Sequence, residues 1–277
     1  MRLEPAQVAV VTGGASGLGL AMAQEFAARG LSIVLGDVER DALDNAVIAV
    51  ENAGVPVLGV PTDVRFADQV DALAAATIER FGRVDIICNN AGVATMSGPT
   101  WEVPLEDWQW VLEVNLQGVV HGIRSFVPHL VAQNAGHVVN TASMAGVSAG
   151  PGMAPYLASK HAVFALSEGL AAELAEAAPG VRVTVVCPGS MDTSIATAER
   201  NRPAELNRPG PEIDPLSLDT FMAWINSITQ PGLMSPADAA AIVVAAVEAD
   251  APRSFPNGSG IGSRGWMQPV IADLPAD

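Results

Sequence analysis

Val8-Ala-Val-Val-Thr12, followed at once by Gly13-Gly-Ala-Ser-Gly-Leu-Gly19, is the stretch from which the fold can be predicted. The apolar run predicts a buried strand, and the glycines after it predict a tight turn. Apolar residues then recur at helical spacing from Leu18 to Arg29, which predicts a helix. A buried strand that turns directly into a helix is the first unit expected of an α/β fold.

The same alternation of strand and helix continues along the chain. The strands are short and almost continuously apolar, as in parallel sheets that helices cover on both faces. We therefore predict a doubly wound parallel sheet of the Rossmann type, with three layers (α/β/α), in which residues 1–277 form a single domain. The further elements expected are strands at 31–35, 55–60, 84–88, 137–142 and 181–186 and helices at 40–53, 66–81, 105–130, 154–178 and 236–249.

The composition excludes several classes of function. Hydrophobic residues make up 49% of the chain and charged residues 16%, which is enough apolar sequence for a large core. The net charge is 14 − 30 = −16, so the protein should repel nucleic acid and acidic membrane surfaces. No apolar run reaches the roughly 18 residues of a membrane-spanning helix, and the first strand begins too near Met1 to leave room for a signal peptide. We expect a cytoplasmic protein with no nucleic-acid or membrane partner.

The potential metal ligands are not clustered in the sequence. Cys88 and Cys187 each end an apolar run and are expected to be buried free thiols. The four histidines, at 121, 129, 137 and 161, have no spacing with the cysteines that suits zinc. We expect no metal site.

The glycine-rich turn at residues 12–19 predicts a site for the phosphates of a dinucleotide. Small residues let the backbone approach a pyrophosphate, and the start of a helix offers unpaired N–H groups. Asp37 follows the second strand, where its carboxylate could accept both hydroxyls of the adenosine ribose and would repel a 2′-phosphate. No Arg or Lys stands at position 16 or 38 to bind such a phosphate, although Arg40 is close. We predict NAD(H) rather than NADP(H); the alternative for Asp37 is that it only caps the next helix.

Two further strand ends carry candidate cofactor residues. Asp63-Val64 follows the third strand, where the carboxylate could meet the adenine amino group; alternatively, Asp63 caps the helix that begins at Phe66. Asn89-Asn-Ala-Gly92 ends the fourth strand, and its small residues suit a backbone that runs beside the cofactor. Taken alone, the segment at residues 89–92 would be an ordinary loop.

Tyr156 and Lys160 are the only tyrosine and the only lysine in the chain. They lie four residues apart in a predicted helix, so their side chains should share one face. A free phenol has a pKa of about 10, and positive charge from Lys160 would favour the phenolate. The pair therefore predicts a proton donor and acceptor that works near neutral pH.

Together these residues resemble the short-chain dehydrogenase/reductase family, in its shorter, single-domain branch. The resemblance covers residues 6–193 and depends on several motifs that occur in the order and spacing of the family. They are TGxxxGxG at 12–19, Asp63, NNAG at 89–92, Asn115, Ser143, YxxxK at 156–160, and Pro188-Gly189 with Thr193.

The resemblance implies a catalytic set of Asn115, Ser143, Tyr156 and Lys160. Tyr156 would be the general acid for ketone reduction and the general base for alcohol oxidation, and Ser143 would bind the substrate oxygen. Lys160 would also bond the nicotinamide ribose. Asn115 would hold a water that links Lys160 to solvent; its alternative is a buried amide bonded to backbone. The residues implied in cofactor binding are Gly13, Ser16, Gly17, Leu18, Gly19, Asp37, Asp63, Val64, Asn89, Ala91, Gly92, Tyr156, Lys160, Pro188, Gly189, Met191 and Thr193, the last holding the nicotinamide carboxamide.

Residues 190–235 form a long, irregular insert beside the expected cofactor site, and such inserts usually act as lids. Apolar residues at 216–228 predict a short amphipathic helix, which could cover a hydrophobic substrate or pack on a neighbouring subunit. The wall opposite Tyr156 is expected to contain Thr95, Met96, Ala145 and residues 151–153, with few charges.

The C-terminal residues 251–277 are irregular in composition, and no clean seventh strand is expected among the Gly, Pro and Ser residues at 251–265. In the family this strand often makes tetramer contacts, so the departure leaves dimer and tetramer both open. The long helices at 105–130 and 154–178 could still pair two subunits, and we expect a homo-oligomer.

The leading hypothesis is an oxidoreductase that transfers a hydride between NAD(H) and an apolar secondary alcohol or ketone, with alicyclic and steroid-like compounds among the candidates. A second is an NADPH-dependent ketoreductase of acyl or polyketide intermediates, against which Asp37 and the acidic surface weigh. A third is a nucleotide-binding regulator without catalysis, against which the presence of Tyr156, Lys160 and Ser143 weighs.

Overall fold

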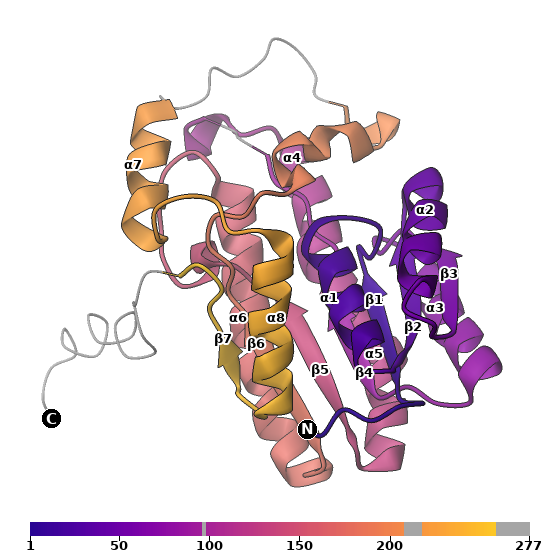
Figure 1. Ribbon diagram of the computed structural model, residues 1–277. Helices are drawn as coiled ribbons and strands as arrows, with labels where there is room; N and C mark the ends of the chain where they lie inside the picture. Colours follow the sequence, from indigo (N-terminus) through magenta and orange to yellow (C-terminus); the bar gives the residue numbers. More distant parts are fainter. Residues whose placement is uncertain (96–97, 208–217, 259–277) are drawn as a thin grey trace, which may run out of the picture.

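In the part of the chain that the structure describes, seven parallel strands form one sheet in the order β3-β2-β1-β4-β5-β6-β7 (Figure 1). The computed structural model describes residues 1–95, 98–207 and 218–258. The expectations for Met96, for residues 208–217 of the insert and for residues 259–277 lie outside the described residues. The doubly wound fold predicted from the sequence is confirmed.

Strands and helices alternate up to β6, as predicted. The strands are β1 (Val8–Thr12), β2 (Ser32–Asp37), β3 (Val57–Pro61), β4 (Ile86–Asn89), β5 (Gly136–Thr141), β6 (Val181–Val186) and β7 (Arg253–Ser254). The α-helices are α1 (Gly17–Ala28), α2 (Arg40–Glu51), α3 (Ala67–Phe81), α4 (Leu105–Leu112), α5 (Gly118–Gln133), α6 (Ala154–Ala177), α7 (Leu218–Ile228) and α8 (Pro236–Glu248). The 3-10 helices are η1 (Thr100–Glu102), η3 (Met144–Gly146), η4 (Ser194–Asn201) and η5 (Ala204–Leu206), and η2 (Glu113–Gln117) is a π-helix.

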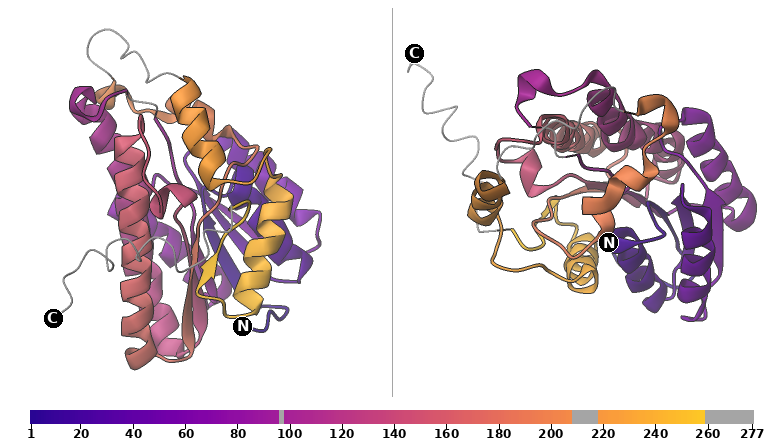
Figure 2. Two further views of the ribbon diagram at one scale, coloured as in Figure 1. Left: turned by 90° about the vertical axis from the view of Figure 1, so that its left-hand side faces the viewer. Right: turned by 90° about the horizontal axis from the view of Figure 1, so that it is seen from above.

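Helices cover both faces of the sheet, as strands that are apolar on both sides require. On one face α1, α2 and α8 pack around a core that includes Phe26 and Val243. On the other face α3, α5 and α6 pack around a core that includes Phe126 and Leu170. Figure 2 shows the sheet between these two layers. The helices cover the faces of the sheet but not its edge at the carboxyl ends of the strands. The loops that follow the strands come together at this edge.

The seventh strand differs from the expectation for the C-terminal segment. Arg253 and Ser254 pair with Val185 and Val186 as a short parallel edge strand. The Arg253 guanidinium also bonds the Glu168 carboxylate of α6, at 3.0 and 2.6 Å. A composition rich in Gly and Pro therefore permits a two-residue strand here, because an edge strand pairs on one side only and a side chain helps to hold it.

The two cysteines are buried free thiols, as predicted. In the described ranges, no helix is long and apolar enough to cross a membrane. The same residues contain no group of three or more His, Cys, Asp or Glu side chains that could hold a metal ion.

Candidate active site

A cleft of about 530 Å³ opens beyond the carboxyl ends of the strands. The order of the sheet reverses between β1 and β4, and doubly wound folds bind their ligands outside such a switch point. Most of the residues predicted to be functional line this one cleft: Gly13, Ser16, Gly17, Leu18, Asp37, Asp63, Val64, Ala91, Gly92, Ser143, Tyr156, Lys160, Pro188, Gly189, Met191 and Thr193. Gly19, Asn89 and Asn115 of the predicted set are not part of its lining.

Two glycines of the glycine-rich turn, Gly13 and Gly19, have no room for a side chain. Gly13 has a φ of +63°, and a Cβ there would lie 2.8 Å from the Cα of Ala91. A Cβ on Gly19 would collide with the carbonyl oxygen of Gly13, so Gly19 lets α1 start directly against the turn. The side chain of Ser16, at the N-cap position, makes no capping bond to α1. The first N–H groups of this helix are therefore left uncapped beside the cleft, which suits a phosphate.

Asp37 closes the end of β2 and is tied to the glycine-rich turn. Its Oδ2 accepts a hydrogen bond from the Ala15 N–H (2.9 Å), and its Oδ1 accepts one from the Glu39 N–H (3.0 Å). Burial raises the pKa of this carboxyl, although both backbone bonds act in the opposite direction. Neither of these N–H groups belongs to α2, which begins at Arg40. The structure therefore does not show Asp37 capping that helix.

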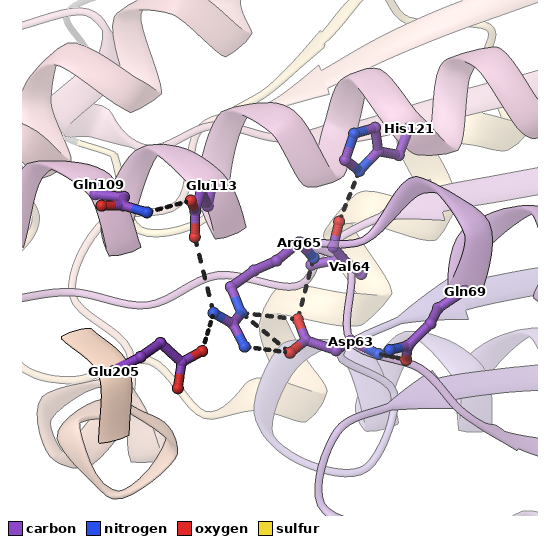
Figure 3. Close-up of polar contacts among 8 residues, drawn as sticks. All are labelled: Asp63, Val64, Arg65, Gln69, Gln109, Glu113, His121 and Glu205. Carbon is purple, nitrogen blue, oxygen red and sulfur yellow. Dashed lines mark hydrogen bonds and ion pairs between the residues drawn. The ribbon is translucent and has the colours of Figure 1, made fainter. Parts of the chain in front are cut away.

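Asp63 is held by Arg65 (Figure 3). Its carboxylate accepts bonds from the Arg65 backbone N–H (3.1 Å), Nε (3.0 Å) and Nη2 (2.8 Å). The same guanidinium lies 3.4 Å from Glu205 and 3.8 Å from Glu113, so it joins carboxylates from three parts of the chain. The Asp63 side chain does not cap α3, whose N-cap residue is Phe66. Asp63 and Arg65 both line the cleft.

The two asparagines after β4 have different environments. Asn89 is buried, and its Nδ2 donates to the Oδ1 of Asn140 (2.8 Å) within the core. Asn90 lines the cleft; its Nδ2 donates to the Thr12 carbonyl oxygen (3.1 Å), and its Oδ1 accepts from the Thr141 hydroxyl (3.3 Å). Asn89 was the asparagine predicted to bind the cofactor, whereas the side chain that lines the cleft belongs to Asn90.

Ser143, Tyr156 and Lys160 come together in the cleft. Ser143 follows β5, and its hydroxyl is hydrogen-bonded to Tyr156. Lys160 lies one turn further along α6, with its Nζ 5.7 Å from the centre of the Tyr156 ring. The Lys160 ammonium donates to the Thr141 carbonyl oxygen (2.9 Å). The shared helix face predicted from the spacing of Tyr156 and Lys160 is confirmed.

The pKa values correct one expectation. Burial raises the pKa of the Tyr156 phenol above its ordinary value, and the hydrogen bond from Ser143 only partly offsets this. Burial also lowers the pKa of Lys160 to about 8. The Lys160 ammonium lies over the ring and bonds Thr141, and burial of the phenol outweighs the effect expected of this charge. Further positive charge beside the phenol is needed to bring its pKa down.

Asn115 lies behind Lys160 at the centre of the π-helix that interrupts the predicted helix over 105–130. Its Oδ1 accepts the Val93 N–H (2.8 Å), and its Nδ2 donates to the Val93 carbonyl (2.9 Å) and the Ser159 hydroxyl (3.1 Å). A Cβ on Gly92 would lie 3.4 Å from both Asn115 Oδ1 and Lys160 Nζ. The amide thus bonds backbone, as in the alternative, and both it and the ammonium lie close to Gly92.

Residues 194–206, the first part of the predicted lid, are anchored by ion pairs. Arg200 pairs with Glu39 (2.7 Å), which follows β2, and both line the cleft. Arg202 pairs with the buried Asp107 of α4 (2.7 Å) and lies over the Trp110 ring. Together with the contact between Arg65 and Glu205, these pairs fix this segment to α4 and to the residues that follow β2 and β3.

Another part of the cleft is apolar. Of the described residues expected in the wall opposite Tyr156, Ala145 and Met153 line the cleft, whereas Thr95 is buried and does not. This part includes apolar side chains from the loop after β5 and from α7: Met144, Met153, Trp224, Ile225 and Ile228.

The predicted site residues did not include Arg65, Arg200 or Arg202, and they included Asn90 only as a member of the motif at 89–92. Asn90 follows the last residue of β4, and the alternation of side chains along a strand could have separated it from Asn89. For Arg65, the Asp-x-Arg spacing with Asp63 is a weak local signal that the two side chains form an ion pair. For the ion pairs of Arg200 with Glu39 and of Arg202 with Asp107 there is none, because these partners lie far away in the sequence.

Lys160→Met is expected to stabilise the fold at pH 7. Lys160 is 2% exposed, and its pKa falls from 10.5 to about 8 on folding. Below pH 8 the folded protein therefore carries a buried charge that costs about 3 kcal/mol, and loss of the bond to Thr141 offsets about 1 kcal/mol of the gain from removing it. Between pH 8 and 10.5 the unfolded chain binds more protons than the folded one, so the wild type gains stability as pH rises.

The measurement is urea denaturation of both proteins at pH 7 and at pH 10. The variant should be more stable by about 2 kcal/mol at pH 7, and the difference should shrink or reverse at pH 10. A difference that is the same at both pH values would contradict the assigned pKa.

Known proteins share both the sequence pattern and the structure. The sequence pattern of the family described as short chain dehydrogenase matches residues 7–204. The chain is 38% identical over 231 residues to 1-deoxy-11-beta-hydroxypentalenate dehydrogenase of Streptomyces exfoliatus, covering 80% of this chain and 83% of that protein. It is also 38% identical over 200 residues to 2-(R)-hydroxypropyl-CoM dehydrogenase of Xanthobacter autotrophicus, covering 71% of this chain and 79% of that protein.

Among solved structures, the fold resembles a short chain dehydrogenase/reductase from Burkholderia phymatum in complex with NAD. The TM-score is 0.84 and the sequence identity 39%, over 92% of this chain and 90% of that one. Because the family pattern spans most of the chain and the relatives match over most of their lengths, this chain belongs to the short-chain dehydrogenase/reductase family and is an oxidoreductase.

Proposed function

We propose that this enzyme transfers a hydride between NAD(H) and an apolar secondary alcohol or ketone. The observation that carries the proposal is the meeting of Tyr156, Ser143 and Lys160 in one cleft at the switch point of the sheet. The two relatives at 38% identity support it, since both are named as dehydrogenases of hydroxylated compounds.

The residues around the cleft fit a nicotinamide dinucleotide. The turn at residues 13–19 leaves its backbone open to a pyrophosphate, and Asp37 would bind the adenosine ribose. Asp63 and Val64 would flank the adenine, and residues 188–193 would hold the nicotinamide end. The cofactor supplies the hydride acceptor for alcohol oxidation and the hydride donor for ketone reduction. The choice of NAD rests on the Asp37 carboxylate, which would repel a 2′-phosphate.

Tyr156 would take the hydroxyl proton of the alcohol as its C–H hydride leaves, and would return a proton in the reverse direction. Ser143, whose hydroxyl bonds Tyr156 in the structure, would turn its single O–H to the substrate oxygen and place that oxygen beside the phenol. Lys160, still mostly protonated at neutral pH, adds positive charge one turn away, and oxidised nicotinamide would add more. Asn115 would hold a water that carries the proton from Lys160 towards solvent.

The substrate would be apolar, because methionine, isoleucine and tryptophan side chains line the cleft beyond Ser143 and Tyr156. Such a wall stabilises a hydrocarbon skeleton by removing it from water. It offers a thioester or a sugar few groups with which to bond.

The test is formation of NADH from NAD⁺ with a panel of cyclic, aromatic, steroidal and aliphatic secondary alcohols, run in parallel with NADP⁺. We expect turnover with NAD⁺ on apolar members of the panel. Turnover with NADP⁺ alone would contradict the role of Asp37 and favour a ketoreductase of acyl intermediates. Cofactor binding without turnover of any alcohol or ketone would contradict the enzyme proposal.

A further inference from the structure

Helix α7 packs on the loop before α6 through one very close contact. A Cβ on Gly150 would lie 2.5 Å from the Cγ of Trp224 and would collide with its Cδ2 and Cε2. Because all three atoms belong to the indole ring, the ring lies directly against the Cα of Gly150. No side chain larger than hydrogen fits between them.

The backbone itself does not require glycine at position 150. The φ of Gly150 lies outside the left-handed region, in contrast to Gly152, at +83°. Alanine could therefore adopt the Gly150 conformation without strain. What glycine provides here is the space that the indole of Trp224 occupies.

Trp224 is at the same time part of the cleft wall. Together with Ile225 and Ile228 it packs on the apolar cluster that contains Met144. The loop that seats the indole continues into α6, where Tyr156 follows Gly150 by 156 − 150 = 6 residues. Figure 1 shows α7 beyond the carboxyl ends of the strands. The lid helix and the catalytic tyrosine are thus joined through one short segment.

An indole is a large, rigid apolar surface, and it gains most from a partner that also presents a broad apolar face. We propose that Trp224 determines substrate specificity: its indole is the wall on which an apolar, ring-containing skeleton packs, and Gly150 is the residue that positions it. The inference rests on the proposed function and names its substrate class, alicyclic or polycyclic secondary alcohols in preference to short acyclic ones.

The test compares Trp224→Ala, Trp224→Phe and Gly150→Ala on two alcohols, isopropanol and the ring-containing alcohol that the wild type oxidises fastest. For the ring-containing alcohol, Trp224→Ala should lower kcat/KM by about tenfold to a hundredfold, mainly through KM. Gly150→Ala should reproduce part of this loss, and Trp224→Phe should retain most of the wild-type value. For isopropanol the loss of kcat/KM should be at least about tenfold smaller than for the ring-containing alcohol, and the Kd of NADH should match the wild type.

Two controls separate specificity from damage to the fold. Gly169→Ala makes the same change at a glycine of α6 where a Cβ meets nothing within 4 Å, and Trp101→Ala removes an indole that is 84% exposed. Both should leave the two substrates unaffected.

Failure of the role of Trp224 can be distinguished from failure of the proposed function. Equal losses on both alcohols, or a preference of the wild type for isopropanol, would overturn the role of Trp224 while leaving the proposed function intact. A wild type that oxidises no alcohol would overturn the proposed function, and this inference with it.

Discussion

Tyr156→Phe is expected to remove nearly all turnover and to leave cofactor binding intact. The change deletes one oxygen, the atom that would exchange a proton with the substrate and that bonds Ser143. The ring packs against the large core cluster, so phenylalanine should keep the local structure. A positioned proton donor contributes about 10²–10⁴-fold to the rate, and kcat should fall by at least that factor.

The measurement pairs kcat for the best alcohol with the Kd for NADH, obtained by fluorescence titration. His161→Gln is the matched control: this titratable ring follows Lys160 directly but is exposed and bonds the Leu157 carbonyl, so its loss should not change kcat. Turnover near the wild-type level in Tyr156→Phe would show that the proton passes through another group.

Asp37→Asn is expected to remove most of the preference for NADH over NADPH. A carboxylate facing a 2′-phosphate is a like-charge contact, which costs several kcal/mol, so the wild type should bind NADPH at least about a hundredfold more weakly than NADH. Asparagine keeps the shape and an oxygen for the Ala15 N–H, but not the charge. NADH binding should weaken as well, because a neutral amide is a poorer acceptor for the ribose hydroxyls.

Both dissociation constants should be measured for the wild type, for Asp37→Asn and for Asp41→Asn, which removes the same charge from an exposed position in the first turn of α2. Asp41→Asn should behave like the wild type. Similar dissociation constants for NADH and NADPH in the wild type would refute the assignment of Asp37.

Local sequence patterns were enough to predict the parts of the site that depend on neighbours along the chain. The spacing of Tyr156 and Lys160 placed both side chains on one face of α6, because four residues make about one helical turn. The apolar run before Gly13 likewise predicted β1 and the turn after it. In each case the backbone geometry of a single element determines where the side chains lie.

Other features depend on contacts between distant segments, which no local pattern records. The bond between Asn115 and Val93 joins a π-helix to the segment after β4, yet the residues around Asn115 have ordinary helical periodicity. The need for Gly150 arises from Trp224, on a different element. The pKa of Tyr156 is raised by burial, which depends on the whole fold and cannot be seen in the spacing of Tyr156 and Lys160.

Because Tyr156 is the only tyrosine, isotope-labelled tyrosine gives a single ring signal by NMR, and its pH titration reports the pKa of the proposed acid and base directly. Without cofactor, the pKa should lie above the ordinary value for a phenol, because burial outweighs the bond from Ser143. With NAD⁺ bound, added positive charge should lower it clearly. A pKa that NAD⁺ leaves unchanged would contradict the account of Tyr156 as the group whose proton is exchanged during hydride transfer.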